Sequence, residues 1–195
     1  MSAVYDPQTE HFYFVFTNYG GALASQGIVL ARMAFADRYE PVGKVHKYYN
    51  GAWEEPGLRG LTTPLFPARR SWAETNMLSH WGPAVHWNQY LNQWVMLLNE
   101  ACCEENWPQT GIWISYGTDL SNLESWTRPV QLLGRGQLPK QPGFYPQILG
   151  LEPGVGTDTL GGKISRLYVH GISDWEIEFD FAKPEVSDPP PPPIE

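Results

Sequence analysis

Cysteine is almost absent from this chain of 195 residues, which has only the neighbouring pair Cys102 and Cys103. Two cysteines are too few for the disulfide framework of a small secreted domain, and they lack the spacing of a zinc site. A bridge between neighbours needs a strained geometry, so the sequence favours two ordinary thiols at a strand end. Metal binding, redox chemistry and a vicinal bridge remain the alternatives.

Positive charge and long apolar runs are also scarce. Thirteen Lys and Arg face 21 Asp and Glu, for a net charge of −8. Nucleic acid and anionic membranes are bound through Lys/Arg patches, so neither is an expected partner. No apolar run approaches the ~20 residues of a transmembrane helix, and the first residues lack the features of a signal peptide. The sequence predicts a soluble protein without a visible export signal.

Signatures of cofactor chemistry are missing as well. The glycines at 154–156 and 161–162 lack the strand-to-helix setting of a nucleotide loop and are interpreted as hairpin turns. The five histidines are scattered, with no pair at the spacing of metal ligands. We therefore expect neither a cofactor nor a metal.

Aromatic residues, glycine and proline are abundant instead. The chain has nine Trp, ten Tyr and eight Phe, with 19 Gly and 18 Pro. Glycine and proline in such numbers divide a chain into short segments, and aromatic residues are favoured in strands. This composition predicts an all-β fold.

An internal repeat refines that prediction. Residues 3–18 align without a gap on residues 84–99, and each copy reads as a short strand, a polar turn and a strongly apolar strand. Third strands are expected at 27–32 and 111–116. Fourth strands are expected to open at Pro41-Val42 and Pro129-Val130, because proline suits the first residue of an edge strand.

Four-stranded antiparallel units of this kind are typical of β-propeller blades. We predict three blades, at about residues 1–50, 81–134 and 143–183, with a long inter-blade loop at 51–80 and a proline-rich, disordered tail at 184–195. Propellers typically need four to eight blades to close a ring. The chain is therefore expected to be the C-terminal part of a longer propeller, with self-association as another way to complete it.

The opening of the second blade resembles a known family. Trp81-Gly82-Pro83-Ala84-Val85-His86, a turn, and then residues 93–98 are similar to an inner hairpin of the five-bladed propeller glycosidases of families 43 and 32. The resemblance implies a funnel that binds sugars and three carboxylates at the mouths of inner strands. An inverting pair of these flanks the scissile bond at ~6.5–9.5 Å.

This sequence departs from that pattern at the catalytic positions. Trp81 stands where the family has an acidic residue, and the third unit offers Phe144 or Tyr145. The family's catalytic residues therefore have no counterpart here. Glu74, in the long loop seven residues before Trp81, is the candidate catalytic carboxylate. Glu100, near Glu104 and Glu105, is interpreted as a solvated charge at a strand end.

Aromatic residues are the candidates for binding a sugar. Trp53, Trp81 and Tyr145 could form stacking platforms for its apolar faces. His86 and Trp87 follow on the inner strand, where alternation turns one of them toward the channel. Gln147 lies in the opening of the third unit.

The sequence thus predicts a glycoside hydrolase-like propeller that acts on or binds carbohydrate. A non-catalytic carbohydrate-binding propeller is one alternative, favoured by the missing carboxylates. A protein-interaction scaffold is the other, with slight support from the proline tail.

Overall fold

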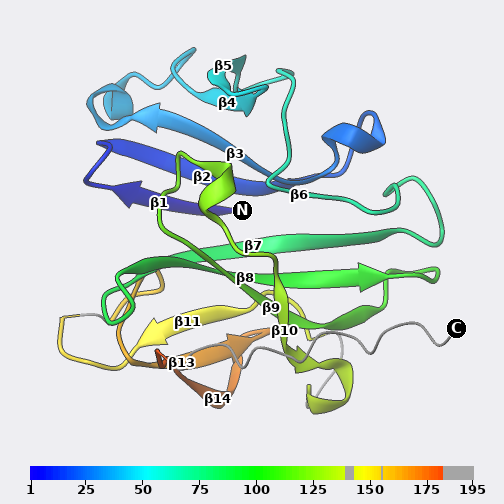
Figure 1. Cartoon of the computed structure of the whole chain (residues 1–195), viewed down its shortest axis with the longest axis vertical. Coiled ribbons are helices and arrows are strands. Elements are labelled where there is room, and N and C mark those ends of the chain that lie inside the picture. The colour runs from blue at the N-terminus through cyan, green and yellow to red at the C-terminus, as the bar shows by residue number, and fades with distance from the viewer. Residues whose placement is uncertain (139–142, 155, 182–195) are drawn as a thin grey trace, which may run out of the picture.

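The computed structural model describes residues 1–138, 143–154 and 156–181 and shows three β-sheets (Figure 1). Regular helix is confined to short 3-10 turns in this part of the chain, which confirms the predicted all-β class. None of the helices in these ranges is long and apolar enough to cross a membrane. The proline-rich tail predicted at 184–195 lies outside the described residues.

The first sheet contains the N-terminal hairpin. Its strands lie in the order β1 (Ser2–Asp6), β2 (His11–Asn18), β3 (Gly27–Ala34), β4 (His46–Tyr49) and β5 (Ala52–Pro56), and β6 (Phe66–Pro67) pairs with β3. In β2, alternate residues Tyr13 and Val15 are fully buried. That period of two is what makes the segment a strand with one face on the core.

The second and third sheets follow in sequence. The second sheet has the order β10 (Val130–Gly134), β9 (Gln109–Gly117), β8 (Gln93–Cys102), β7 (Leu78–Asn88) and β12 (Leu160–Gly161), the last parallel to β7. The third sheet has the order β11 (Gln147–Gly150), β13 (Ile164–Val169) and β14 (Ile172–Glu178). Short 3-10 turns span Leu23–Ser25, Phe35–Tyr39, Leu123–Ser125 and Arg135–Gln137.

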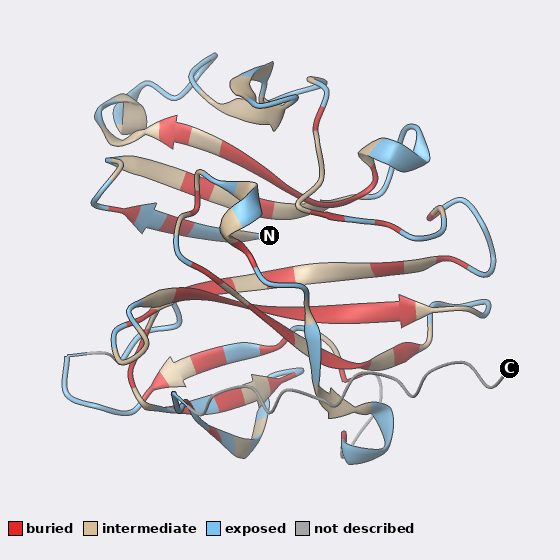
Figure 2. Ribbon diagram, viewed as in Figure 1, coloured by how far each residue is buried: buried red, intermediate tan, exposed pale blue. Residues whose placement is uncertain are grey.

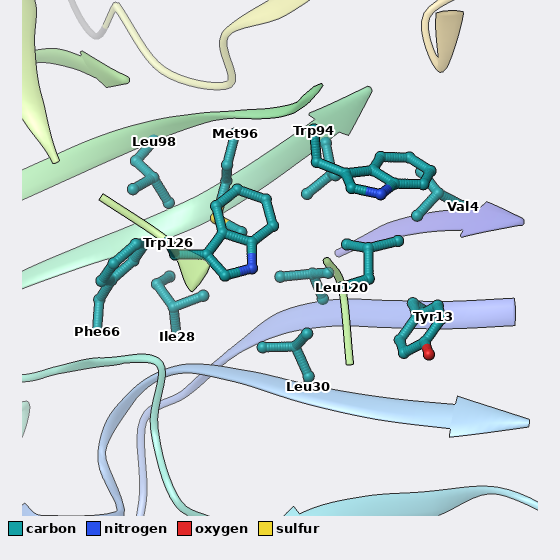
Figure 3. Packing of buried hydrophobic residues seen from close by; sticks show 12 residues of the cluster. Val4, Tyr13, Ile28, Leu30, Phe66, Trp94, Met96, Leu98, Leu120 and Trp126 are labelled. Atoms are coloured by element: carbon teal, nitrogen blue, oxygen red, sulfur yellow. The ribbon is translucent and has the colours of Figure 1, made fainter. Parts of the chain in front are cut away.

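Strand β8 lies between two hydrophobic cores. Trp94, Met96 and Leu98 pack against the first sheet, as Figure 3 shows around Ile28 and Leu30. The other face of β8, with Val95 and Leu97, packs against the third sheet. Both faces are covered, so β8 is buried along nearly its whole length (Figure 2).

Several predicted boundaries need correction. Residues 41–45 form an exposed turn, closed by a bond from the Lys44 N–H to the Pro41 carbonyl, and the fourth strand starts only at His46. Val42 is 93% exposed, so it gains nothing from a place in a sheet. The segment 51–80, predicted as irregular, contains β5, β6 and the start of β7. Proline obscured these short strands because it cannot donate to a ladder.

The repeat is also shifted by one residue from the ungapped alignment. The hairpin turns are closed by the pairs Asp6–His11 and Asn88–Gln93, which relates the two hairpins by 82 residues rather than 81. A shift of one residue moves every side chain to the other face of its sheet. By this correspondence, Tyr13 matches Val95, and each of the two faces the next sheet along the chain.

Candidate functional site: an aromatic cleft

Aromatic side chains from distant segments enclose a cleft of about 300 Å³. We call it the aromatic cleft, and its lining residues are Tyr19, Trp72, Trp81, Asn106, Trp107, Phe144 and Tyr145. They come from the end of β2, the turn before β7, β7 itself, the loop after β8 and the segment before β11. A volume near 300 Å³ is at the small end of the range for ligand pockets.

The rings of the cleft meet edge to face. Trp72 lies with its ring centroid 4.7 Å from that of Tyr19 and 5.2 Å from that of Trp107. Across the cleft, Trp81 lies 5.5 Å from Tyr145. Edge-to-face contacts leave ring faces available. Trp107 is 50% exposed and Tyr145 is 59% exposed, so both can meet a ligand.

Asn99, a buried residue of β8, fixes one wall of the cleft. Its Oδ1 accepts hydrogen bonds from the Tyr145 N–H (3.2 Å) and from Gln109 Nε2 (2.9 Å). Its Nδ2 donates to the carbonyl oxygens of Trp81 (3.3 Å) and Gly82 (3.4 Å). One side chain therefore joins the strand that holds Trp81 to the segment that holds Tyr145.

Gln26 does the same for the opposite wall. It is buried just before β3, and its Oε1 accepts a hydrogen bond of 2.9 Å from the Trp72 N–H. Its Nε2 donates to Ser71 Oγ (3.1 Å) and to the Gly21 carbonyl oxygen (2.8 Å). Trp72 is consequently held in place from the first sheet.

Left-handed backbone conformations gather around the cleft. Asn106, Trp107 and Tyr145 have φ values of 63°, 53° and 58°. For residues other than glycine such conformations cost on the order of 1–3 kcal/mol, and they tend to occur at binding sites. Here they turn Trp107 and Tyr145 toward the cleft.

The two cysteines lie at the start of the same loop. Their sulfur atoms are bonded to each other, so the interpretation of Cys102 and Cys103 as ordinary thiols is wrong. Cys103, with φ at 100°, has turned out of the strand direction. The bridge ties the end of β8 to the loop that carries Trp107.

Of the predicted sugar-binding residues, the structure brings Trp81 and Tyr145 together in the cleft. Trp53 lies elsewhere, on β5. It packs edge to face on Tyr13 and Tyr48, with the Arg32 guanidinium 4.7 Å from its ring centroid. It serves the first sheet's core and has no place in the cleft.

The other three candidates are also separated from the cleft. His86 is buried against Phe179, and burial lowers the pKa of its imidazole to about 3. Trp87 lines a second cavity of about 470 Å³ beside Trp94, six residues along β7 from Trp81 and thus ~20 Å away. Gln147 borders a small cavity of about 110 Å³ beside Met1.

Glu74, the candidate catalytic carboxylate, lies on an exposed turn. Its N–H donates to the Ser71 carbonyl oxygen (3.0 Å), and its carbonyl oxygen accepts from the Met77 N–H (3.3 Å). The turn follows Trp72, but Glu74 is not among the residues that line the aromatic cleft.

Glu100, by contrast, is buried, so its interpretation as a solvated charge is wrong. It forms an ion pair with Arg69, and the Thr110 hydroxyl donates to its Oε2 (2.9 Å). His80 Nε2 lies 3.7 Å from Glu100 Oε1, yet burial and the Arg69 charge lower the pKa of His80 to about 4. The carboxylate is thus occupied by structural partners.

Sequence reasoning missed half of the cleft. Tyr19, Trp72 and Trp107 were not singled out, and Phe144 entered only as a strand opening. Each lies just after or before a strand rather than within one. An aromatic residue at a strand end is a usable signal, because loop residues at one edge of stacked sheets can converge on a single site.

The described residues contain no cluster of three or more His, Cys, Asp and Glu that could hold a metal ion. No protein-family model, curated protein or solved structure matches this chain.

Proposed function

We propose that this protein binds carbohydrate in the aromatic cleft and leaves the glycosidic bond intact. The observation that carries the proposal is the pair of half-exposed rings, Trp107 and Tyr145, on opposite walls of a small preformed cleft. Aromatic faces bind the apolar faces of pyranose rings, and the walls are held by Asn99 and Gln26. Pre-organised walls reduce the entropic cost of binding.

Two indole N–H groups add a polar requirement. Nε1 of Trp72 and Nε1 of Trp81 are buried and have no hydrogen-bond partner among the described residues. Buried donors normally find acceptors. A sugar offers hydroxyl oxygens, which are acceptors of the kind that these two donors lack.

The chemistry of the cleft favours binding over hydrolysis. Cleavage of a glycosidic bond generally needs two carboxyl groups on either side of it. The residues that line the cleft in the described part of the chain include no Asp or Glu. The nearby buried carboxylate, Glu100, is committed to Arg69 and Thr110.

The proposal includes a propeller arrangement of the three sheets. It is supported by the repeat: Tyr13 and Val15 face the second sheet, while their counterparts Val95 and Leu97 face the third. Repeats related by rotation about an axis present the same face to the next unit, as propeller blades do. The first and second sheets also share an antiparallel meander of four consecutively paired strands, β1–β4 and β7–β10.

The test is a titration of tryptophan fluorescence with xylo-, arabino-, cello-, manno- and malto-oligosaccharides. At least one should bind, and Trp107→Ala should weaken that binding at least about tenfold, as loss of an aromatic contact does. Tyr39→Ala is the matched control, because Tyr39 is an aromatic residue 81% exposed outside the cleft.

A reducing-end assay on the bound oligosaccharide completes the test. No release is expected from the wild type. Binding that survives Trp107→Ala unchanged, or no binding in the whole panel, would overturn the cleft as the site. Release of reducing ends that Glu74→Gln abolishes would replace the binding function by hydrolysis.

A further inference from the structure

The first sheet has an aromatic side that faces away from the second sheet. In β2, Tyr13 and Val15 are buried toward the second sheet, so the intervening Phe12, Phe14 and Phe16 lie on the opposite side, where they remain partly exposed. We call these three residues, with Tyr5 and Phe35, the aromatic face.

The aromatic face is continuous. The ring centroid of Tyr5 lies 5.4 Å from that of Phe12 and 4.7 Å from that of Phe35, and Phe12 and Phe35 are 5.5 Å apart. Tyr5 itself is 38% exposed. Contiguous apolar patches of this kind mark interaction sites on soluble proteins.

The repeat shows what covers such a face. By the 82-residue correspondence, Phe12, Phe14 and Phe16 match Trp94, Met96 and Leu98 of β8. Those three residues are 5%, 0% and 0% exposed, because the first sheet packs on them. The same side of the same strand is therefore covered by a β-sheet where this chain provides one.

A second copy of the chain offers two outer sheet faces. That of its third sheet carries the ion pairs Arg166–Glu176 (3.2 Å) and Lys163–Glu178 (3.0 Å), whose burial would require desolvation of four charges. The aromatic face carries no charge at its five defining positions. It is the better complement to another aromatic face.

The available area suits such a contact. The first sheet has five strands in its main path, and β2 is eight residues long. With strands ~4.8 Å apart and ~3.3 Å per residue, one side covers roughly 600 Å². A standard stable interface buries about 800 Å² of accessible surface per partner, which the relief of a side-chain surface brings within reach.

We propose that two copies of this chain associate through their aromatic faces, around a two-fold axis, to form a dimer. The same patch then serves both partners, as in other two-fold dimers. This inference depends on the packing of the sheets and not on carbohydrate binding.

Sedimentation velocity from about 1 to 100 µM tests the proposal. The wild type should be a dimer in this range, and Phe14→Arg should shift it to monomer, with a dissociation constant raised at least about tenfold. Ile164→Arg is the matched control, because Ile164 is a partly exposed apolar residue (37%) on the third sheet. It should leave the dimer intact.

Tyr5→Arg keeps the test decisive if Phe14→Arg does not fold, because the more exposed Tyr5 contributes less to the monomer's core. A monomeric wild type throughout the range would overturn the proposal. Dissociation by Ile164→Arg but not by Tyr5→Arg would also overturn it, since the third sheet would then form the contact.

Discussion

At the residue scale, the charge of Glu100 is the clearest case of a polar group on which the structure depends. Its side chain is 5% exposed, whereas that of its partner Arg69 is 59% exposed. The Thr110 hydroxyl that donates to Glu100 also accepts a hydrogen bond from Trp113 Nε1 (3.2 Å). The carboxylate therefore links the end of β8 to β9 and to the turn that carries Arg69.

Removing that charge should destabilise the protein. We expect Glu100→Gln to lower the free energy of unfolding by about 1–3 kcal/mol, the range for a hydrogen bond to a charged group. Urea denaturation at pH 7 measures it. Glu104→Gln, four residues away on the exposed loop, is the matched control and should change stability by less than about 0.5 kcal/mol. Equal effects of the two would contradict a structural role for Glu100.

His86 predicts a dependence of stability on pH. The unfolded imidazole takes up a proton near pH 6.5, whereas burial lowers its folded pKa to about 3. Between these values the unfolded chain binds more protons, so stability falls as pH decreases from 6.5 toward 3. Between pH 6.5 and 4.5 this amounts to roughly 2 kcal/mol from His86.

The measurement compares urea denaturation at pH 6.5 and 4.5. His86→Leu should lose that part of the decline, while the exposed-residue control His170→Asn should keep it. Asparagine is chosen for the control because residue 170 has a φ of 54°, which asparagine tolerates. The same decline in all three proteins would mean that His86 is protonated in the fold.

At the element scale, a glycine opens the third strand of each repeat at a point where two backbones meet. A Cβ on Gly27 would clash with the Phe66 carbonyl oxygen, and one on Gly111 with the Leu133 carbonyl oxygen. The φ values of 130° and 151° are unfavourable for other residues too. The two repeats thus solve the same packing problem in the same way.

Gly111→Ala should accordingly lower the free energy of unfolding by at least about 2 kcal/mol, since both strain and a backbone clash oppose it. Gly136→Ala is its control, because a Cβ there meets no atom within 4 Å. Thermal and urea denaturation should show the control close to wild type. A Gly111→Ala protein as stable as the control would mean that β9 and β10 can separate at no cost.

The sequence predicted the strands whose side chains alternate. The hairpin around Pro7 and the one around Tyr90 are both present, because buried and exposed residues alternate in β2 and an apolar run marks β8. The register was lost, since chance identities such as Ala3 with Ala84 outweighed the pairing at the turns.

Half of the cleft was predictable for a similar reason. Trp81 and Tyr145 lie at strand openings that the repeat made visible, so they were found. Trp72 and Trp107 lie in loops 35 residues apart, and only the stacking of the sheets brings them together. Glu100 was misread because nothing local in the sequence shows that Arg69 lies beside it.

At the scale of the whole molecule, β8 makes the three sheets depend on one another. Met96 is fully buried against the first sheet and its neighbour Leu97 against the third. Neither outer sheet can keep its core if β8 leaves. The described sheets should therefore unfold together in a single transition rather than one at a time.

Hydrogen exchange read by mass spectrometry at increasing urea tests that dependence. Peptides from β2 in the first sheet and β13 in the third should lose protection at the same urea concentration. Met96→Ala should move both transitions down equally, by about 2–5 kcal/mol, although its side chain contacts only the first sheet's core. If Met96→Ala shifted β2 and left β13 in place, the third sheet would be an independent unit, and β8 would bind it without supporting it.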